Sequence, residues 1–195
     1  MNRRSFIKIS STGVLSFAIG SVATLDGCTV FDDILTWVPI GLTAIQGIVT
    51  VLGPLISPGA LTILALIKAG FADLSAAVSE YNNDTNPADK ANLLSKIRTI
   101  LADIVSNFQA FLDALNLGDN PIINIVIGLA NIVISAIEGF MNQLPSTKST
   151  ALTTRLSLGS KSITVTPKFY KSVKDFKKDY NSFALANNHG EIIIH

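Results

Sequence analysis

Three segments of this chain begin in the same way, with a capping residue followed by proline at the start of a long apolar run. The pairs are Ser57-Pro58, Asn86-Pro87 and Asn120-Pro121. A Ser or Asn side chain accepts a hydrogen bond from a free N–H in the first turn of a helix, and proline at the first helical position loses no hydrogen bond there. The repeated pattern predicts three helix starts and restricts the chain to an architecture of long helices.

Short polar or glycine-containing turns separate the apolar runs, so successive helices should be antiparallel neighbours. The expected fold is therefore mainly α, with an up-down four-helix bundle formed by residues 28–145. The expected helices cover residues 31–52 (with a break or kink at Pro39), 58–81, 87–115 and 121–144.

Two of these helices show a buried seam, because apolar side chains recur in them at alternating spacings of three and four residues. In the helix over 87–115, the charged side chains Asp89, Lys96, Asp103 and Asp113 fall off the seam and should face solvent. The seams consist of Ala60, Leu64, Ile67, Phe71, Leu74, Val78 and Tyr81 in one helix and of Leu94, Ile97, Leu101, Ile104, Phe108, Phe111 and Leu115 in the next.

Residues 146–195 change character and should form a small α+β appendage. Residues 154–158 and 162–166 alternate between polar and apolar side chains around Gly159-Ser160, which predicts a β-hairpin. A basic amphipathic helix should follow, and 191–195 should form a strand. We expect the aromatic seam of this helix to pack on the bundle, the alternative being that its lysines dock on anionic lipid headgroups. The seam is Phe169, Val173, Phe176, Tyr180 and Phe183, and the lysines are Lys168, Lys171, Lys174, Lys177 and Lys178.

Two of the expected bundle helices carry almost no charge. No charged residue occurs from Ile34 through Ile67, and none from Pro121 through Ile137. A bundle helix needs an apolar stripe only about 100° wide. The surplus apolar surface must therefore contact the appendage, another protomer, lipid or an apolar ligand. The helix over 121–144 keeps one polar stripe, which consists of Asn124, Asn131, Ser135, Glu138 and Asn142.

The first residues carry a motif with paired arginines, and the stretch after it is weakly hydrophobic because serine, threonine and glycine dilute it. Such dilution argues against a stable transmembrane helix. The motif consists of Arg3, Arg4, Phe6, Ile7 and Lys8. Residues 1–27 resemble a twin-arginine (Tat) signal peptide. The resemblance implies that the Tat translocase exports the folded protein to the periplasmic side of a bacterial cell envelope.

The single cysteine, Cys28, follows directly after this stretch. Leu25-Asp26-Gly27-Cys28 resembles a bacterial lipobox, in which the cysteine is lipidated and becomes the mature N-terminus. Asp26 departs from the pattern, which usually has a small or uncharged residue there, and Ser21-Val22-Ala23 offers a competing cleavage site. The resemblance implies a periplasmic lipoprotein anchored to a membrane through Cys28, since two or more acyl chains suffice for stable anchoring.

The residue inventory excludes several kinds of chemistry. A lone cysteine forms no internal disulfide or thiolate cluster, and the only histidines are His189 and His195. A di-iron bundle needs about four glutamates and two histidines on its helices, whereas this chain has three glutamates in all. No histidine base for a nucleophilic triad and no glycine-rich phosphate loop occurs in the bundle. We therefore expect no cofactor and no metal site, and the sequence assigns no catalytic residue.

Net charge argues against nucleic acid as a partner. The whole chain has a formal charge of +1 at pH 7. Arg3, Arg4, Lys8 and Asp26 give residues 1–27 a charge of +2, which leaves residues 28–195 near −1. A nearly neutral chain offers no broad basic surface.

Three functional hypotheses follow from the surplus apolar surface. The first is a non-enzymatic envelope lipoprotein whose apolar helices bind a protein partner or self-associate. The second is a carrier that holds a lipid, quinone or pigment in a hollow bundle core. The third inserts the hairpin Ile34–Ile67 into the membrane. We disfavour insertion because Pro39, Gly53, Pro54, Pro58 and Gly59 should break this hairpin into pieces shorter than the ~20 residues that a span needs.

Overall fold

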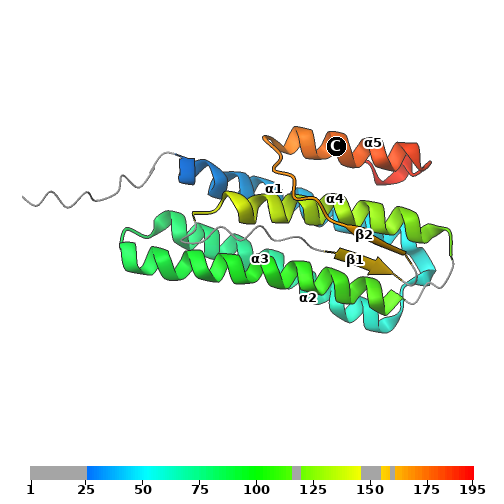
Figure 1. The fold of residues 1–195 in the computed structure, drawn as a ribbon, viewed down its shortest axis with the longest axis horizontal. Helices are drawn as coiled ribbons and strands as arrows, with labels where there is room; N and C mark the ends of the chain where they lie inside the picture. Colours follow the sequence, from blue (N-terminus) through cyan, green and yellow to red (C-terminus); the bar gives the residue numbers. More distant parts are fainter. Residues whose placement is uncertain (1–25, 116–119, 146–154, 159–160) are drawn as a thin grey trace, which may run out of the picture.

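Helices make up most of the structure, a computed structural model that describes residues 26–115, 120–145, 155–158 and 161–195 (Figure 1). The expected mainly α fold is confirmed. The long helices are α1 (Asp26–Leu52), α2 (Pro58–Asn83), α3 (Pro87–Leu115) and α4 (Ile122–Gln143), with the short 3₁₀ helix η1 (Gly53–Leu55) between the first two. They are followed by strands β1 (Arg155–Leu158) and β2 (Lys161–Thr164), helix α5 (Val173–Ala186) and the 3₁₀ helix η2 (Gly190–Ile192).

The predicted capping bonds occur at all three helix starts, but α4 begins one residue later than expected, at Ile122, with Pro121 as its N-cap residue. Ser57 Oγ, Asn86 Oδ1 and Asn120 Oδ1 each accept a hydrogen bond from a backbone N–H two or three residues further on, at 3.0–3.1 Å. Each bond satisfies a donor that the helix itself leaves free. These starts are therefore determined by contacts within a few residues of sequence.

Pro39 does not interrupt the first helix, so the expected break is wrong. α1 is helical without a gap from Asp26 to Leu52. Proline in a helix interior removes a hydrogen bond and costs about 3 kcal/mol. The residues beside it, Trp37 and Val38, are buried in the core, and their burial offsets that cost. Tertiary packing therefore overrides the helix-breaking tendency of proline at position 39.

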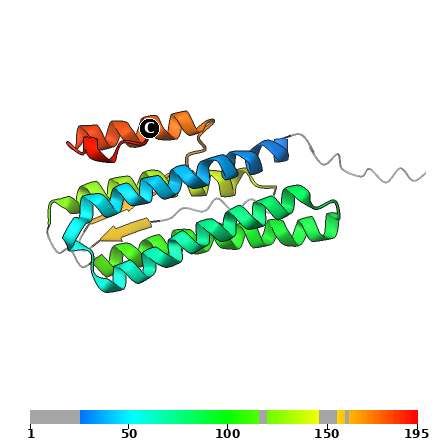
Figure 2. The same cartoon turned by 180° about the vertical axis from the view of Figure 1, so that it is seen from behind.

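The long helices lie side by side along one axis in two layers (Figures 1 and 2). One layer consists of α1 and α4, and the other of α2 and α3. α5 lies on the outer side of the α1–α4 layer. The start of α1 lies beside the turn between α2 and α3, where the rings of Phe31 and Tyr81 are 4.0 Å apart. The outer side of α2 therefore faces away from α5.

β1 and β2 pair antiparallel, with Arg155 opposite Thr164 and Leu158 opposite Lys161. β1 lies against α3 and α4, on the side of the molecule that faces the viewer in Figure 1. β1 therefore lies at the junction between the two helix layers on that side.

The expected strand over 191–195 is wrong. The chain forms η2 over Gly190–Ile192, and no strand follows it in the described residues. Asn181 of α5 instead pairs with the backbone of Ile194: its Oδ1 accepts from the Ile194 N–H at 2.8 Å, and its Nδ2 donates to the Ile194 carbonyl at 3.0 Å. A side-chain amide therefore satisfies the backbone groups that a neighbouring strand would otherwise pair.

One hydrophobic core extends through the helix layers and reaches α5. Trp37 of α1 lies in it and contacts rings from three other helices. The ring centroids of Phe71 in α2, Phe140 in α4 and Phe176 in α5 are 5.5, 5.4 and 5.6 Å from that of Trp37. The predicted seams of α2 and α3 are confirmed, since their residues are buried except for the half-buried Tyr81 and Leu94.

Candidate functional site

The predicted export and lipidation residues lie at or before the start of the described chain. Cys28 belongs to the first turn of α1, at the end of the molecule that carries the α2–α3 turn. The motif residues Arg3, Arg4, Phe6, Ile7 and Lys8 lie outside the described residues. The export signal and the lipid anchor therefore stay predictions.

Helix α5 contacts α1 through a buried hydrogen bond beside a glycine. Tyr180 is fully buried, and its hydroxyl donates to the Ala44 carbonyl at 2.9 Å. Almost one turn further along α1, a Cβ added at Gly47 would overlap this hydroxyl. Burial raises the pKa of Tyr180 far above its ordinary value, so the hydroxyl keeps the proton that it donates. Glycine at position 47 therefore permits the close approach of the two helices.

The segment before α5, and α5 itself, lie close against α4. The backbone N–H of Lys168 donates to the Ser135 carbonyl at 2.9 Å. A Cβ added at Gly139 would overlap the Lys168 backbone, and one added at Gly128 would overlap the Phe183 ring. Two glycines of α4 thus allow the C-terminal segment to contact the helix backbone directly.

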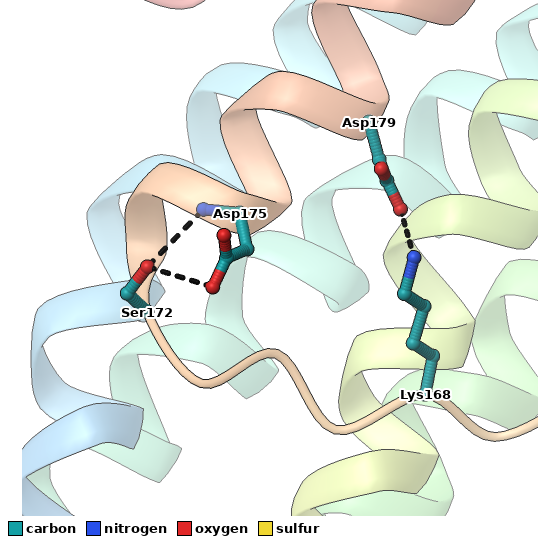
Figure 3. Close-up of polar contacts among 4 residues, drawn as sticks. All are labelled: Lys168, Ser172, Asp175 and Asp179. Carbon is teal, nitrogen blue, oxygen red and sulfur yellow. Dashed lines mark hydrogen bonds and ion pairs between the residues drawn. The ribbon is translucent and has the colours of Figure 1, made fainter.

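Polar contacts orient the start of α5 (Figure 3). Ser172 Oγ accepts from the Asp175 N–H at 3.2 Å and donates to the Asp175 carboxylate at 3.0 Å. Lys168 forms an ion pair with Asp179, one turn further along α5. Burial, and then the Asp179 carboxylate, raises the pKa of Tyr170 above its ordinary range. Exposed ion pairs contribute only about 0–1 kcal/mol, so the buried aromatic contacts dominate the docking of α5.

The aromatic seam of α5 packs on the bundle, as predicted. Phe176 and Tyr180 are fully buried, whereas Lys171, Lys174 and Lys178 are exposed. The appendage therefore covers part of the surplus apolar surface of α1 and α4.

The polar stripe expected along α4 is only partly exposed. Asn124 and Asn142 face solvent, but Ser135 and Glu138 are buried, at 5% and 0% exposure. The segment that leads to α5 passes over α4 at this level, where it bonds to Ser135. The α4 sequence gives no signal of this burial because the covering segment is distant in the chain.

α2 presents an apolar face that no other part of the described chain covers. Leu61 and Leu66 are 51% and 53% exposed. Only 33% of the most apolar stretch of α2 is buried, against 67% for α4. Four alanines on the same side of the helix are also exposed: Ala65, Ala69, Ala72 and Ala76. The surplus apolar surface that remains open therefore lies mainly on α2.

Three helical segments in the described residues are long and apolar enough to cross a membrane, by length and composition only: Val30–Leu55, Pro58–Asn83 and Ile122–Gln143. The expectation that Pro39 leaves only shorter pieces is therefore wrong. The reason is the continuity of α1 through Pro39.

Within the part of the chain that the structure describes, ionisable side chains form pairs and no larger reactive cluster. No group of three or more His, Cys, Asp or Glu side chains that could hold a metal ion occurs in the described residues. His189 Nδ1 lies 2.6 Å from Glu191 Oε1 in the turn after α5, and this hydrogen bond lowers the pKa of Glu191. The pair links two residues of the turn that follows α5.

The sequence prediction missed the three glycines that position the C-terminal segment, Gly47, Gly128 and Gly139. A glycine inside a helical pattern costs about 1 kcal/mol relative to alanine, which signals a close packing contact. That signal could have identified α1 and α4 as the helices on which the appendage packs.

Comparison with known proteins assigns no family and no activity to the chain. The chain matches no family model, no curated protein and no solved structure.

Proposed function

We propose that this chain is an exported cell-envelope lipoprotein that acts as a helical interaction module. Residues 1–27 direct export through the Tat translocase, and lipidated Cys28 anchors the protein on the periplasmic side of the membrane. Residues 28–145 form an up-down four-helix bundle, and 146–195 form its hairpin-and-helix appendage. The sequence Leu25-Asp26-Gly27-Cys28, which resembles a lipobox at the end of the signal-like stretch, supports the anchor.

The outward face of α2 is the observation that carries the proposed interaction. Leu61, Ala65, Ala72 and Ala76 lie along one exposed line of a helix whose other side is buried, with Lys68 beside this line and Leu66 at the edge of the exposed side. Contiguous exposed apolar surface on a protein marks an interaction site. We assign this face to self-association, with a second copy of the chain as the partner.

The order of large and small residues on α2 supports this partner. Leu61 and Ala72 are eleven residues apart, close to three helical turns, so they lie along one line of the helix about 16 Å apart. In an antiparallel two-fold pair, Leu61 of each copy lies over Ala72 of the other. Facing large and small side chains interdigitate, so the face is complementary to itself.

Replacing both leucines, Leu61→Gln and Leu66→Gln, should weaken self-association of the purified Cys28→Ala protein about tenfold or more. The physical reason is the loss of apolar contact from the interface. Sedimentation equilibrium measures the dissociation constant. The matched control is Leu185→Gln, because Leu185 of α5 is 56% exposed and lies outside α2. A wild-type protein that stays monomeric, or equal weakening by Leu185→Gln, would contradict the assignment.

Replacing Arg3 and Arg4 together by lysine should retain the protein in the cytoplasm, because the motif requires the arginines and not merely their charge. Cys28→Ala should leave export intact and release the protein from the membrane fraction, since the acyl chains supply the anchor. Cell fractionation and the intact mass of the processed protein measure both effects. A mature protein that begins at Thr24 and carries no lipid would exclude the lipoprotein assignment and support cleavage after Ala23.

A further inference from the structure

A groove lies on the outside of the molecule between α1 and α2. It has a volume of about 410 Å³ and is lined by Leu42, Thr43 and Gln46 of α1 and by Lys68 of α2. Binding sites for small molecules usually have volumes of about 300–1,000 Å³ and combine apolar walls with a few polar groups. The groove matches this description in size, is open to solvent, and is lined by one apolar side chain, Leu42, beside Thr43, Gln46 and Lys68.

Lys68 is the only ionisable residue from Ile34 through Ala72, so it is an isolated charge on an otherwise uncharged surface. The ion pairs found in the described residues join Lys96 to Glu80, Lys168 to Asp179 and His189 to Glu191, and none involves Lys68. Within the same residues, the Gln46 side chain makes no hydrogen bond. The groove therefore offers one ammonium group and one amide that are available to a ligand.

Apolar surface continues from Lys68 toward the turn between α1 and α2. Leu61 lies seven residues before Lys68, so the two side chains share one side of α2 and are about 10 Å apart. Leu61 is 51% exposed. A ligand whose anionic group lies at Lys68 can therefore extend an aliphatic chain along the helix toward Leu61.

We propose that this groove binds a single-chain anionic amphiphile of the fatty-acid class. The carboxylate pairs with the Lys68 ammonium and accepts a hydrogen bond from the Gln46 amide, and the chain extends along α2 toward Leu61, with Leu42 beside the carboxylate end. One isolated cation fits one negative charge, and the uncharged flanks of α1 and α2 fit the hydrocarbon. The site moves the ligand of the carrier hypothesis from the bundle core to the outer groove. It shares Leu61 with the proposed self-association face, so decanoate should compete with self-association through α2.

Titration of the purified Cys28→Ala protein with decanoate tests the proposal. We expect one decanoate per chain. Butyrate should bind at least tenfold more weakly because it lacks the long apolar chain, and 1-decanol about fivefold more weakly because it lacks the carboxylate that pairs with Lys68. Lys68→Met keeps most of the side-chain length and removes the charge. It should weaken decanoate binding about fivefold, the upper range for an exposed ion pair, and leave 1-decanol binding unchanged. Calorimetry gives the affinities and the stoichiometry.

The matched control is Lys96→Met, because Lys96 is an exposed lysine of α3 that lies outside the groove; it should leave decanoate binding unchanged. Equal affinity of the Lys68→Met variant for decanoate, or equal binding of decanoate and 1-decanol, overturns the proposal. So does binding to phosphatidylglycerol vesicles that depends on Lys68 in the absence of decanoate binding, since the ligand is then a bilayer surface. Sedimentation of the same samples separates these outcomes from a failure of α2 self-association.

Discussion

Trp37→Ala should lower the free energy of unfolding by about 3–5 kcal/mol, the usual cost of removing a large buried aromatic side chain. Trp37 is 1% exposed and contacts Phe71, Phe140 and Phe176, which belong to three different helices. The substitution leaves a cavity where both helix layers and α5 meet. Chemical denaturation followed by far-UV circular dichroism measures the change.

Trp37→Phe is the informative control for this site. The indole N–H of Trp37 is buried and has no hydrogen-bond partner among the described residues. A buried unpaired donor costs about 1–3 kcal/mol, so phenylalanine removes a penalty while it retains an aromatic ring in the core. We expect Trp37→Phe to cost less than about 1.5 kcal/mol. A loss as large as that of Trp37→Ala would mean that the indole N–H makes a stabilising bond.

The helix starts were predictable because their determinants are local. Ser57, Asn86 and Asn120 each bond to a backbone group within three residues, so the sequence around each cap contains the whole interaction. The same holds for the seams of α2 and α3, since helical periodicity alone defines which side is buried. Pro39 shows the limit of local evidence, because its effect depends on how strongly neighbouring side chains are held by the core.

The packing of α5 on α1 and α4 could be predicted only as one of several alternatives for the surplus apolar surface. The sequence shows surplus apolar surface and an amphipathic C-terminal helix, but it does not show that Tyr180 meets Ala44 or that Phe183 meets Gly128. Such pairs join residues far apart in the chain, and no periodicity encodes them. The burial of Glu138 in α4 and the open groove beside Lys68 could not be predicted either, because both depend on where distant segments of the chain lie.

Gly139→Ala should destabilise the protein by about 1–3 kcal/mol and loosen the C-terminal segment. A methyl group at this position overlaps the backbone of Lys168, which cannot rotate away as a flexible side chain would. The segment must shift, which weakens the hydrogen bond from the Lys168 N–H to the Ser135 carbonyl. Overpacking costs about 1–3 kcal/mol and a lost hydrogen bond about 0.5–1.5 kcal/mol, whereas alanine regains about 1 kcal/mol of helix propensity.

Thermal unfolding and amide hydrogen exchange measure the two effects of Gly139→Ala separately, with exchange expected to accelerate selectively in α5. The matched control is Gly59→Ala near the start of α2, where the nearest atom to an added methyl is Ser57 Oγ at 3.9 Å. This control should be neutral or stabilising by up to about 1 kcal/mol, because it gains helix propensity without an overlap. If both variants had the same stability and the same α5 exchange, close packing at Gly139 would not hold α5 in place. In that case the aromatic contacts of Phe176 and Tyr180 alone would account for its docking.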